Sequence, residues 1–360
     1  MNKKVKALLK ALLSLILVFV FVIVGYASYL LISYSRIADN EELIPLSNES
    51  TEILRTGEVL SVMTQNIGFG AYTPDFTFFM DGGEKSWAES PESVKECIGK
   101  AVETVKEYSP DFILFQEVDF DSTRSYHIDQ RRMLRDAFSS YSSVFAENYH
   151  SAYLFYPFNE PHGASYAGIL TLSRFDISSG LRRSLPISES FSKFLDLDRC
   201  YSISRIPVEN GRELVLFNVH LSAYGGSDEI REAQMNMLLD DMKTEYEKGN
   251  YCVTGGDFNH DFTGDSTLRL NGGKELSFGW AQPFPVEMLP DCIERCDRYD
   301  GDSLVPTCRN CDIPYKEGND VFIVDGFLIT KNVEAVSLMN IDTGFSYSDH
   351  NPVKLEFILK

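Results

Sequence analysis

The chain has 360 residues, of which 44% are hydrophobic, and its formal net charge at pH 7 is −20. This hydrophobic content is enough for a large core and excludes a wholly disordered chain. The negative charge and the lack of a basic run argue against non-specific binding to nucleic-acid backbones, although a bound divalent cation can supply local positive charge.

The N-terminal region predicts a transmembrane signal-anchor helix at residues 11–32. These 22 positions carry no charged side chain, and at 1.5 Å per residue they span the ~30 Å hydrocarbon core of a bilayer. A basic tail, residues 1–10, precedes the run, so the positive-inside rule places this tail in the cytoplasm and everything after residue 32 outside. A cleaved signal peptide is the alternative, but the run exceeds the usual apolar region of about 7–15 residues.

The rest of the chain divides into a polar, acidic juxtamembrane linker at residues 33–56 and one folded domain at residues 57–360. Strands alternate with amphipathic helices in the domain, which predicts a mixed α/β fold. The predicted strands are 58–68, 111–118, 213–221, 251–256 and 321–330, and the predicted helices are 91–108 and 228–247.

Two loops, residues 71–87 and 148–162, each carry five Phe, Tyr or Trp side chains. They form either local loop cores or a rim that grips an apolar or stackable substrate.

Four of the seven cysteines lie close together in the sequence. Their spacing, C-x3-C-x11-C-x2-C, is compatible with a structural zinc site, and one or two disulfides are an equally natural use outside a membrane. The odd total leaves at least one thiol unpaired. The four residues are Cys292, Cys296, Cys308 and Cys311.

Polar side chains follow the predicted strands at the points where the strands end. In α/β sheets, ligand sites gather beyond the carboxyl ends of strands. A single strand-end Asp or Asn is usually a turn former, but such residues at successive strand ends predict one shared site. The residues are Asn66, Glu117, Asn218, His220, Asp257, Asn259, Asp325, Asp349 and His350.

The residue types at these positions predict phosphate chemistry with a metal. Glu117 and Asn66 offer hard oxygen ligands, which suit Mg²⁺, Mn²⁺ or Ca²⁺. His220 and His350 can donate to a phosphate or transfer a proton near neutral pH.

Three further residues have complementary abilities. Asp325 can fix the tautomer of His350, and Asp257 can hold and deprotonate an attacking water. Asn259 can only exchange hydrogen bonds, so it suits a phosphate oxygen or the orientation of Asp257.

Seven short pieces, in this order, resemble the endonuclease/exonuclease/phosphatase superfamily of metal-dependent phosphohydrolases. The pieces are MTQNIG, LFQEVD, LFNVHL, GGDFN, VPTCRN, VDGF and SDHNPV, and the resemblance spans about residues 59–354. It implies an α/β fold, a four-layer sandwich of two packed mixed β-sheets flanked by helices.

The resemblance also implies roles for the strand-end residues. Glu117 would be the principal metal ligand, with Asn66 and Asp349 in the same metal shell. The catalytic residues would be Asp257 as the water activator and His350, paired with Asp325, as the transition-state stabiliser or acid/base. The phosphate-binding residues would be Asn259, His220 and Asn218.

Other polar residues have no matching role in that resemblance. Arg124 is expected in a surface ion pair. The remaining histidines are expected on the surface or in loops, and they are His127, His150, His162 and His260.

The leading hypothesis is a membrane-anchored, divalent-metal-dependent phosphoester hydrolase that acts outside the cytoplasm. Its substrate could be a nucleic acid, a phospholipid or sphingomyelin, or an inositol phosphate. A catalytically inactive binding module on the same fold and a structural cell-surface protein are the alternative classes, because fold alone does not secure activity. The sequence implies no protein partner.

Overall fold

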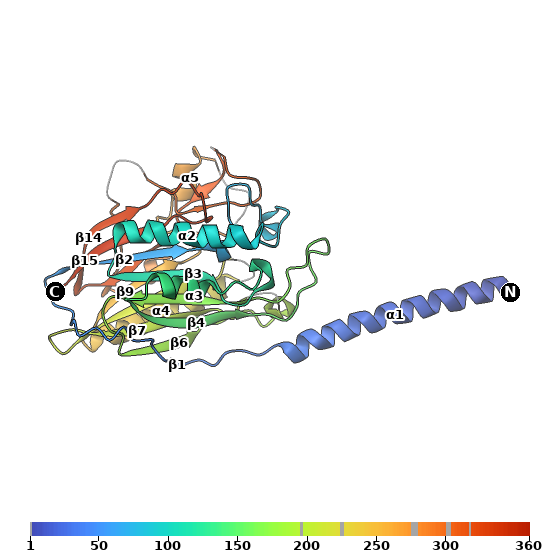
Figure 1. Cartoon of the computed structure of the whole chain (residues 1–360), viewed down its shortest axis with the longest axis horizontal. Helices are drawn as coiled ribbons and strands as arrows, with labels where there is room; N and C mark the ends of the chain where they lie inside the picture. The colour runs from blue at the N-terminus through green and yellow to red at the C-terminus, as the bar shows by residue number, and fades with distance from the viewer. Residues whose placement is uncertain (1, 195–196, 224–226, 275–279, 300–303, 317) are drawn as a thin grey trace. The chain divides into compact units, whose positions relative to one another are not determined.

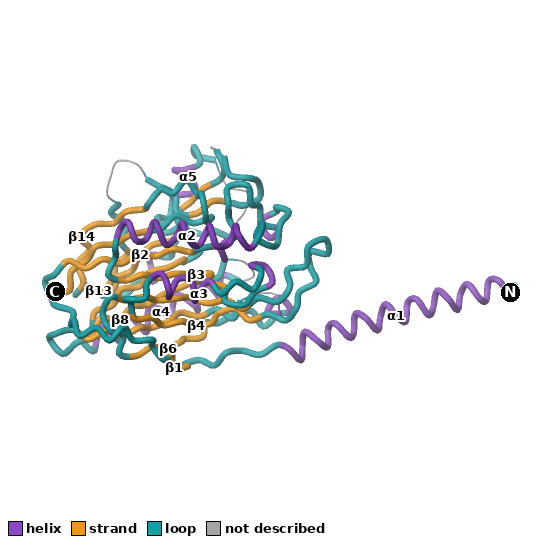
Figure 2. The backbone as a smooth tube through the Cα atoms, viewed as in Figure 1, coloured by secondary structure: helices purple, strands orange, loops and turns teal. Residues whose placement is uncertain are grey.

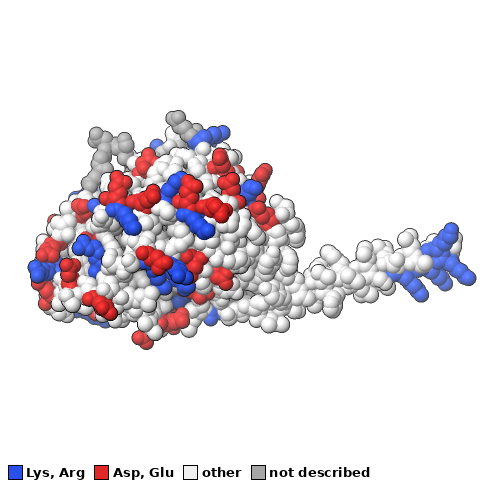
Figure 3. Space-filling view, in the orientation of Figure 1, with Lys and Arg blue, Asp and Glu red and all other residues white. Residues whose placement is uncertain are grey.

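The computed structural model describes residues 2–194, 197–223, 227–274, 280–299, 304–316 and 318–360. The chain divides into two units, Met1–Arg36 and Ile37–Lys360. The first unit is built on α1 (Lys3–Ser33), a helix whose side chains are nearly all exposed. An 18-residue stretch of this helix has a mean hydropathy of 3.0, and the helix is long and apolar enough to cross a membrane. Figure 3 shows its surface as uncharged except for the lysines at its N-terminal end.

Much of the segment expected as a linker folds with the second unit, which begins at Ile37. Within it, β1 (Glu41–Leu43) pairs antiparallel with β6 (Ser179–Ser184), and the side chain of Leu54 is fully buried. The sequence did not predict this pairing, because a strand of three residues is too short to show a period of two. The folded unit is therefore longer at its N-terminal end than residues 57–360.

Two mixed sheets form the centre of the second unit (Figure 2). The larger sheet has the order β1-β6-β7-β8-β9-β13-β10, with β7 (Cys200–Pro207), β8 (Glu213–His220), β9 (Tyr251–Asp257), β10 (Ile293–Arg295) and β13 (Asp325–Thr330). The smaller sheet has the order β14-β15-β2-β3-β5-β4, with β2 (Val59–Asn66), β3 (Phe112–Asp119), β4 (Ser142–His150), β5 (Tyr166–Ser173), β14 (Val333–Asn340) and β15 (Val353–Leu359). A separate ribbon pairs β11 (Cys308–Arg309) with β12 (Val321–Phe322).

The core lies between the two sheets and on their outer faces, as the alternation along β3 illustrates. Phe112 and Leu114 belong to the cluster between the sheets, together with Leu214 and Leu216 of β8. The intervening Ile113 packs against the helices on the outer face. Successive side chains of a strand point to opposite faces, so one strand contributes to both layers of the core.

Helices cover the outer faces of both sheets and complete four layers (Figure 1). α2 (Pro91–Tyr108) and α3 (Gln130–Ala137) pack on the six-stranded sheet, and α4 (Asp228–Glu247) packs on the seven-stranded sheet. The two long helices agree with the predicted ranges, and the four-layer sandwich is confirmed. The remaining helical turns are α5 (Ser266–Leu270), η1 (Gly68–Gly70), η2 (Phe79–Asp81), η3 (Thr123–Ser125), η4 (Phe191–Phe194) and η5 (Val286–Met288).

The prediction of one strand at residues 321–330 was wrong. The chain forms β12, leaves the ladder at Ile323 and Val324, and then enters β13 in another sheet. At the break, the Thr307 hydroxyl accepts hydrogen bonds from the backbone N–H groups of Val324 and Asp325, at 3.0 and 3.1 Å. A continuous apolar run carries no local signal for such a break. Asp325 consequently opens a strand instead of ending one.

Candidate active site

The strand-end residues converge because of how the strands are paired. β8 runs parallel to β9, with His220 in register with Asp257. β13 runs antiparallel to β9, so its first residue, Asp325, also lies opposite Asp257. β2 and β3 run parallel in the other sheet, where Asn66, the last residue of β2, pairs with Gln116, which precedes Glu117. Residues that are distant in the sequence thus meet at one edge of the sandwich, as expected for α/β sheets.

A β-bulge in β3 presents Glu117 to this site. The pairing of β3 with β5 shifts register between Phe115 and Val118, and Glu117 has a positive φ of 54°. Such a conformation is uncommon for a residue other than glycine and often marks a functional position.

The side chain of Asn66 links the two sheets at this point. Its amide nitrogen donates to Glu117 Oε1 and to Asp257 Oδ2, both at 3.1 Å, while its oxygen accepts from the N–H of Gly68 at 2.9 Å. One buried amide therefore fixes the two carboxylates that the sequence assigns to metal binding and water activation.

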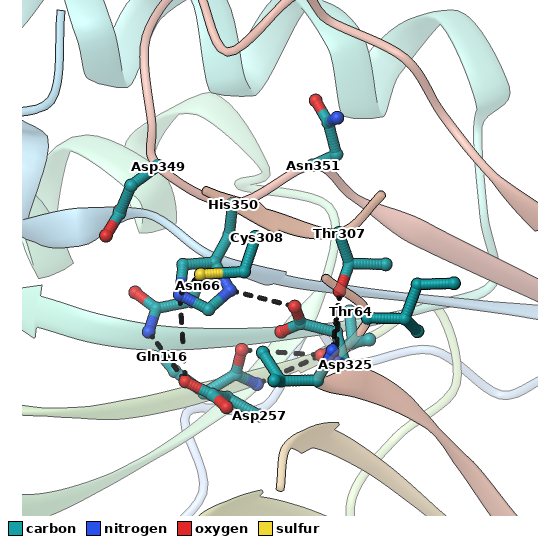
Figure 4. A network of polar contacts seen from close by, with 12 residues as sticks. Thr64, Asn66, Gln116, Asp257, Thr307, Cys308, Asp325, Asp349, His350 and Asn351 are labelled. Carbon is teal, nitrogen blue, oxygen red and sulfur yellow. Dashed lines mark hydrogen bonds and ion pairs between the residues drawn. The ribbon is translucent and has the colours of Figure 1, made fainter. Parts of the chain in front are cut away.

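His350 and Asp325 form a buried pair (Figure 4). His350 Nδ1 lies 2.8 Å from Asp325 Oδ2, and the other ring nitrogen lies 3.8 Å from Asp257 Oδ2. Burial opposes the charged imidazole, but Asp325, Cys308 and Asp349 together raise the pKa of His350 well above its ordinary value. With Nδ1–H donating to Asp325, the cationic ring directs its second N–H toward Asp257.

His220 lies in the same site in the opposite protonation state. Its Nε2 is 3.7 Å from Asp257 Oδ2 and 3.9 Å from Glu117 Oε1. Burial, together with the positive charges of Arg199 and His350, lowers the pKa of His220 well below its ordinary value. Two histidines whose environments separate their pKa values in this way can serve as a proton donor and a neutral hydrogen-bonding group.

Asp257 is held between these groups. Its Oδ1 accepts a hydrogen bond of 2.9 Å from the backbone N–H of Asn259. Burial raises the pKa of Asp257 to about 7, and the attraction of His350 only partly offsets the rise. The preceding residue must be glycine, because Gly256 has a φ of 150° and a Cβ there would lie 2.1 Å from the carbonyl oxygen of Val219.

Asn259 and Asp349 also line the cavity. Asn259 has a φ of 52°, and its amide donates to the carbonyl of Leu221 at 2.8 Å. Asp349 stands apart from the network around Asp257 in Figure 4, and its carboxylate approaches the backbone at Gly68 so closely that a Cβ would meet its oxygen at 2.7 Å. Burial raises the pKa of Asp349 to about 7.

Asn218 is not brought to the cavity. Its side chain is fully buried between the sheets, where its oxygen accepts from Gln116 Nε2 at 2.7 Å and its nitrogen donates to the carbonyls of Phe115 and Leu170, both at 3.2 Å. The prediction that it binds phosphate is not supported. The period of two put it correctly on the face of His220, but it lies deeper, where it joins the sheets instead of facing a ligand.

The cavity has a volume of about 310 Å³ and includes residues that the sequence reasoning missed. Arg124 was expected in a surface ion pair, yet its side chain is 8% exposed and is bound at 2.8 Å to the fully buried Asp119. His162 and His260, expected on the surface or in loops, lie in loops but are buried, and His162 lines the cavity. Arg309 is 1% exposed and lines the cavity; it lies in VPTCRN, the one matched piece to which no role had been given.

The four cysteines do not assemble into a zinc site. Lys331, which follows the last residue of β13, donates its backbone N–H to the carbonyl of Cys292. Cys308 instead lies near the first residue of β13, 3.5 Å from His350 Nε2. Six residues of strand separate these positions by about 20 Å, far beyond the reach of one ion. All seven cysteines are free thiols.

Both aromatic loops contribute side chains to the wall of the cavity, Tyr72 and Phe78 from the first loop and Tyr149 from the second. Tyr72, Phe76 and Phe78 of the first loop are buried in the core beneath α2. In the second loop, Phe155 and Phe158 are 50% and 85% exposed.

A divalent cation fits the acidic residues of this site. Asp257, Asp325 and His350 each offer a ligand atom within 4.8 Å of the others, and Glu117 lies beside them through Asn66. Since the Nδ1 of His350 is engaged with Asp325, the carboxylate oxygens are the better ligands, and they suit hard cations. Burial raises the pKa values of Asp257 and Asp349, and a bound cation would favour their ionised forms.

Comparisons with known proteins agree with the fold. The model of the endonuclease/exonuclease/phosphatase family matches residues 63–350. No curated protein matches. Among solved structures, an endonuclease/exonuclease/phosphatase from Beutenbergia cavernae is 18% identical, with a TM-score of 0.58 over 84% of this chain and 72% of that one. A second protein with the same description, from Bacteroides vulgatus, is 16% identical, with a TM-score of 0.51 over 84% of this chain and 100% of that one.

ANGEL2, a 2′,3′-cyclic phosphatase solved with adenosine-2′,3′-vanadate, is 16% identical, with a TM-score of 0.54 over 84% of this chain and 96% of that one. At these identities the structures support the fold, and the family model covers most of the chain. The chain therefore belongs to the endonuclease/exonuclease/phosphatase family.

Proposed function

We propose that the chain is a divalent-metal-dependent hydrolase of phosphoester bonds. The observation that carries the proposal is the buried pair of His350 and Asp325, at 2.8 Å, which faces Asp257 in a cavity also lined by Glu117. A cation held by Glu117, with Asn66 and Asp349 nearby, would neutralise phosphate charge and polarise the phosphorus–oxygen bonds.

Side chains of the protein would carry out the proton transfer and bind the phosphate. Asp257 accepts a proton from the attacking water, for which a pKa raised to about 7 is well matched near neutral pH. His350 donates its free N–H to the phosphoryl oxygens as negative charge develops there, and Asp325 keeps the ring cationic and oriented. Asn259 and neutral His220 supply hydrogen bonds that position the phosphate.

The proposal is tested with the full chain in detergent, incubated with supercoiled plasmid and, separately, with bis-p-nitrophenyl phosphate. Hydrolysis should require Mg²⁺ or Mn²⁺ and stop with EDTA. His350→Ala should lower the rate by at least ~10², while His127→Ala, which removes an exposed histidine 62% accessible at its side chain, serves as the matched control. Equal rates in the two variants would remove His350 from the reaction.

We further propose that α1 anchors the chain in a membrane, with the basic tail in the cytoplasm and the catalytic domain outside. The support is the length and hydropathy of α1 and the four lysines that precede its uncharged part. Protease added to intact cells that express the chain should then degrade the domain and spare a cytoplasmic marker. Full protection of the domain would contradict this orientation.

A further inference from the structure

Two β-bulges oppose the same stretch of β5, and each brings side chains to the cavity. The bulge in β3 presents Glu117. The bulge in β4 lies between Glu147 and Tyr149, opposite Gly168 and Ala167, so Asn148 has no partner on β5. Both Asn148 and Tyr149 line the cavity. Bulges turn side chains out of the normal alternation and are frequent next to active sites. The proposed hydrolytic mechanism assigns no role to the residues of the second bulge.

The amide of Asn148 is buried without a hydrogen-bonding partner. The residue is 1% exposed, and neither its Nδ2 nor its Oδ1 forms a hydrogen bond within the described residues. A buried amide that forms no hydrogen bond is costly to the fold. Asn148 lies in a β-bulge on the cavity wall, and its amide forms no hydrogen bond that would offset the cost of burial. These features are expected of a side chain whose hydrogen-bonding partner is a ligand.

The part of the wall formed by Phe69, Arg124 and Tyr149 is aromatic, and its arginine is already paired. The Arg124 guanidinium lies 3.9 Å from the ring centre of Phe69 and 5.6 Å from that of Tyr149, and two of its nitrogens are bound to Asp119. His162 also lines the cavity. Burial, assisted by the positive charge of Arg124, lowers the pKa of His162 to about 3, so its ring is neutral at physiological pH.

We infer that Asn148 and His162 form a specificity subsite for an uncharged planar group that carries a hydrogen-bond donor beside an acceptor, such as the edge of a nucleobase. This inference rests on the proposed function, because it names the substrate class of that site as nucleoside phosphoesters. An amide side chain pairs with such an edge through two hydrogen bonds at once. The neighbouring rings offer a stacking surface, which every base can use.

Arg124 and His162 are a poor match for a charged headgroup. The guanidinium of Arg124 is already paired with Asp119, and His162 carries no charge. A charged group placed here would lose its hydration without gaining a counter-charge from these residues.

The inference is tested by comparing two diesters that share a p-nitrophenolate leaving group. The first is the p-nitrophenyl ester of a nucleoside 5′-monophosphate, made with each of the four bases, and the second is bis-p-nitrophenyl phosphate. The measured quantity is the ratio of kcat/KM for the nucleoside ester to that for the second diester. Asn148→Leu, which keeps the branching at Cγ, is somewhat larger and can form neither hydrogen bond, should lower this ratio about tenfold or more for at least one base.

His162→Phe retains an aromatic ring against Phe78 and Phe79, which lie 6.5 and 5.8 Å from the ring of His162, and it should lower the same ratio. His127→Phe is the matched control and should leave the ratio unchanged. A ratio that stays the same in Asn148→Leu, in a protein that unfolds at the wild-type temperature, overturns the subsite and leaves the hydrolase proposal intact. Faster hydrolysis of lipid or inositol phosphoesters than of all four nucleoside esters would also overturn it.

If the wild-type chain cleaves neither diester, the proposed function fails, and the subsite is then judged by binding. Calorimetric titration of the wild-type chain with the four nucleoside monophosphates should show binding that Asn148→Leu weakens about tenfold. Absence of binding for all four nucleotides overturns the subsite as well.

Discussion

Replacement of Asp257 by Asn should change the stability of the metal-free protein in a manner that depends on pH. Asp257 is 1% exposed, and burial raises its pKa from an ordinary 3.8 to about 7. A carboxyl group whose pKa is raised by folding stabilises the folded state fully below pH 4, and this stabilisation is lost as pH rises through 7. Asparagine has the shape of the protonated acid and cannot ionise, so it avoids this loss.

The size of the effect follows from the shift in pKa. About three units at ~1.36 kcal/mol each give an upper value of about 4 kcal/mol at pH 8. In EDTA, Asp257→Asn should therefore equal the wild type only below about pH 4. Its excess in free energy of unfolding should be about 2 kcal/mol at pH 5 and rise to at most about 4 kcal/mol at pH 8. Comparison with the wild type cancels the contributions of the histidines that do not contact Asp257.

The assay is denaturant unfolding of both proteins in EDTA at several pH values between 5 and 8, repeated with saturating Mg²⁺. Bound metal should stabilise the wild type at pH 8 and have less effect on Asp257→Asn, because the cation offsets the buried charge that the substitution removes. A variant that is less stable than the wild type by the same amount at every pH would refute the assignment of a buried, strained carboxylate.

Two further predictions concern the bulges around β5. Glu117→Gln should preserve the fold but lower metal-dependent turnover by at least ~10² and weaken Mg²⁺ binding measured by calorimetry. Glu107→Gln, on the exposed face of α2, is the control. Mg²⁺ binding by Glu117→Gln that equals the wild type would remove Glu117 from the metal site. Gly168→Ala should cost about 2 kcal/mol or more in denaturant unfolding, since a Cβ at Gly168 would lie 2.3 Å from the carbonyl oxygen of Ala146. Gly99→Ala is the control and should be neutral or stabilising, since no atom lies within 4 Å of a Cβ at this position in α2. An equal change in free energy of unfolding for the two variants would show that the strands at the bulges can shift to accept a Cβ.

Local patterns in the sequence were sufficient for the long elements and for much of the site. α2 begins after Ser90, whose hydroxyl accepts from the N–H of Ser93, and it has proline as its first residue. Both are local signals that a reader of the sequence can recognise. The sequence also predicted that four polar residues would meet at one edge, because the carboxyl ends of parallel strands share an edge. These residues are Asn66, Glu117, His220 and Asp257.

Only the tertiary structure decided which polar residues reach the cavity. Asn218 and His220 share a face of β8, but the packing of the second sheet encloses the first and leaves the second beside Asp257. Arg124 was expected in a surface ion pair and His162 on the surface or in a loop, yet contacts between distant segments bury both side chains.

The two bulges, like the break between β12 and β13, have no local sequence signal, since each depends on the strand that lies opposite. The sequence by itself therefore determined the family, the layers and most of the polar residues that line the cavity. The pairing of strands that are remote in the chain determined the directions of these side chains and the position of Asn148. It also determined their pKa shifts, because hydrogen bonding and desolvation depend on remote neighbours.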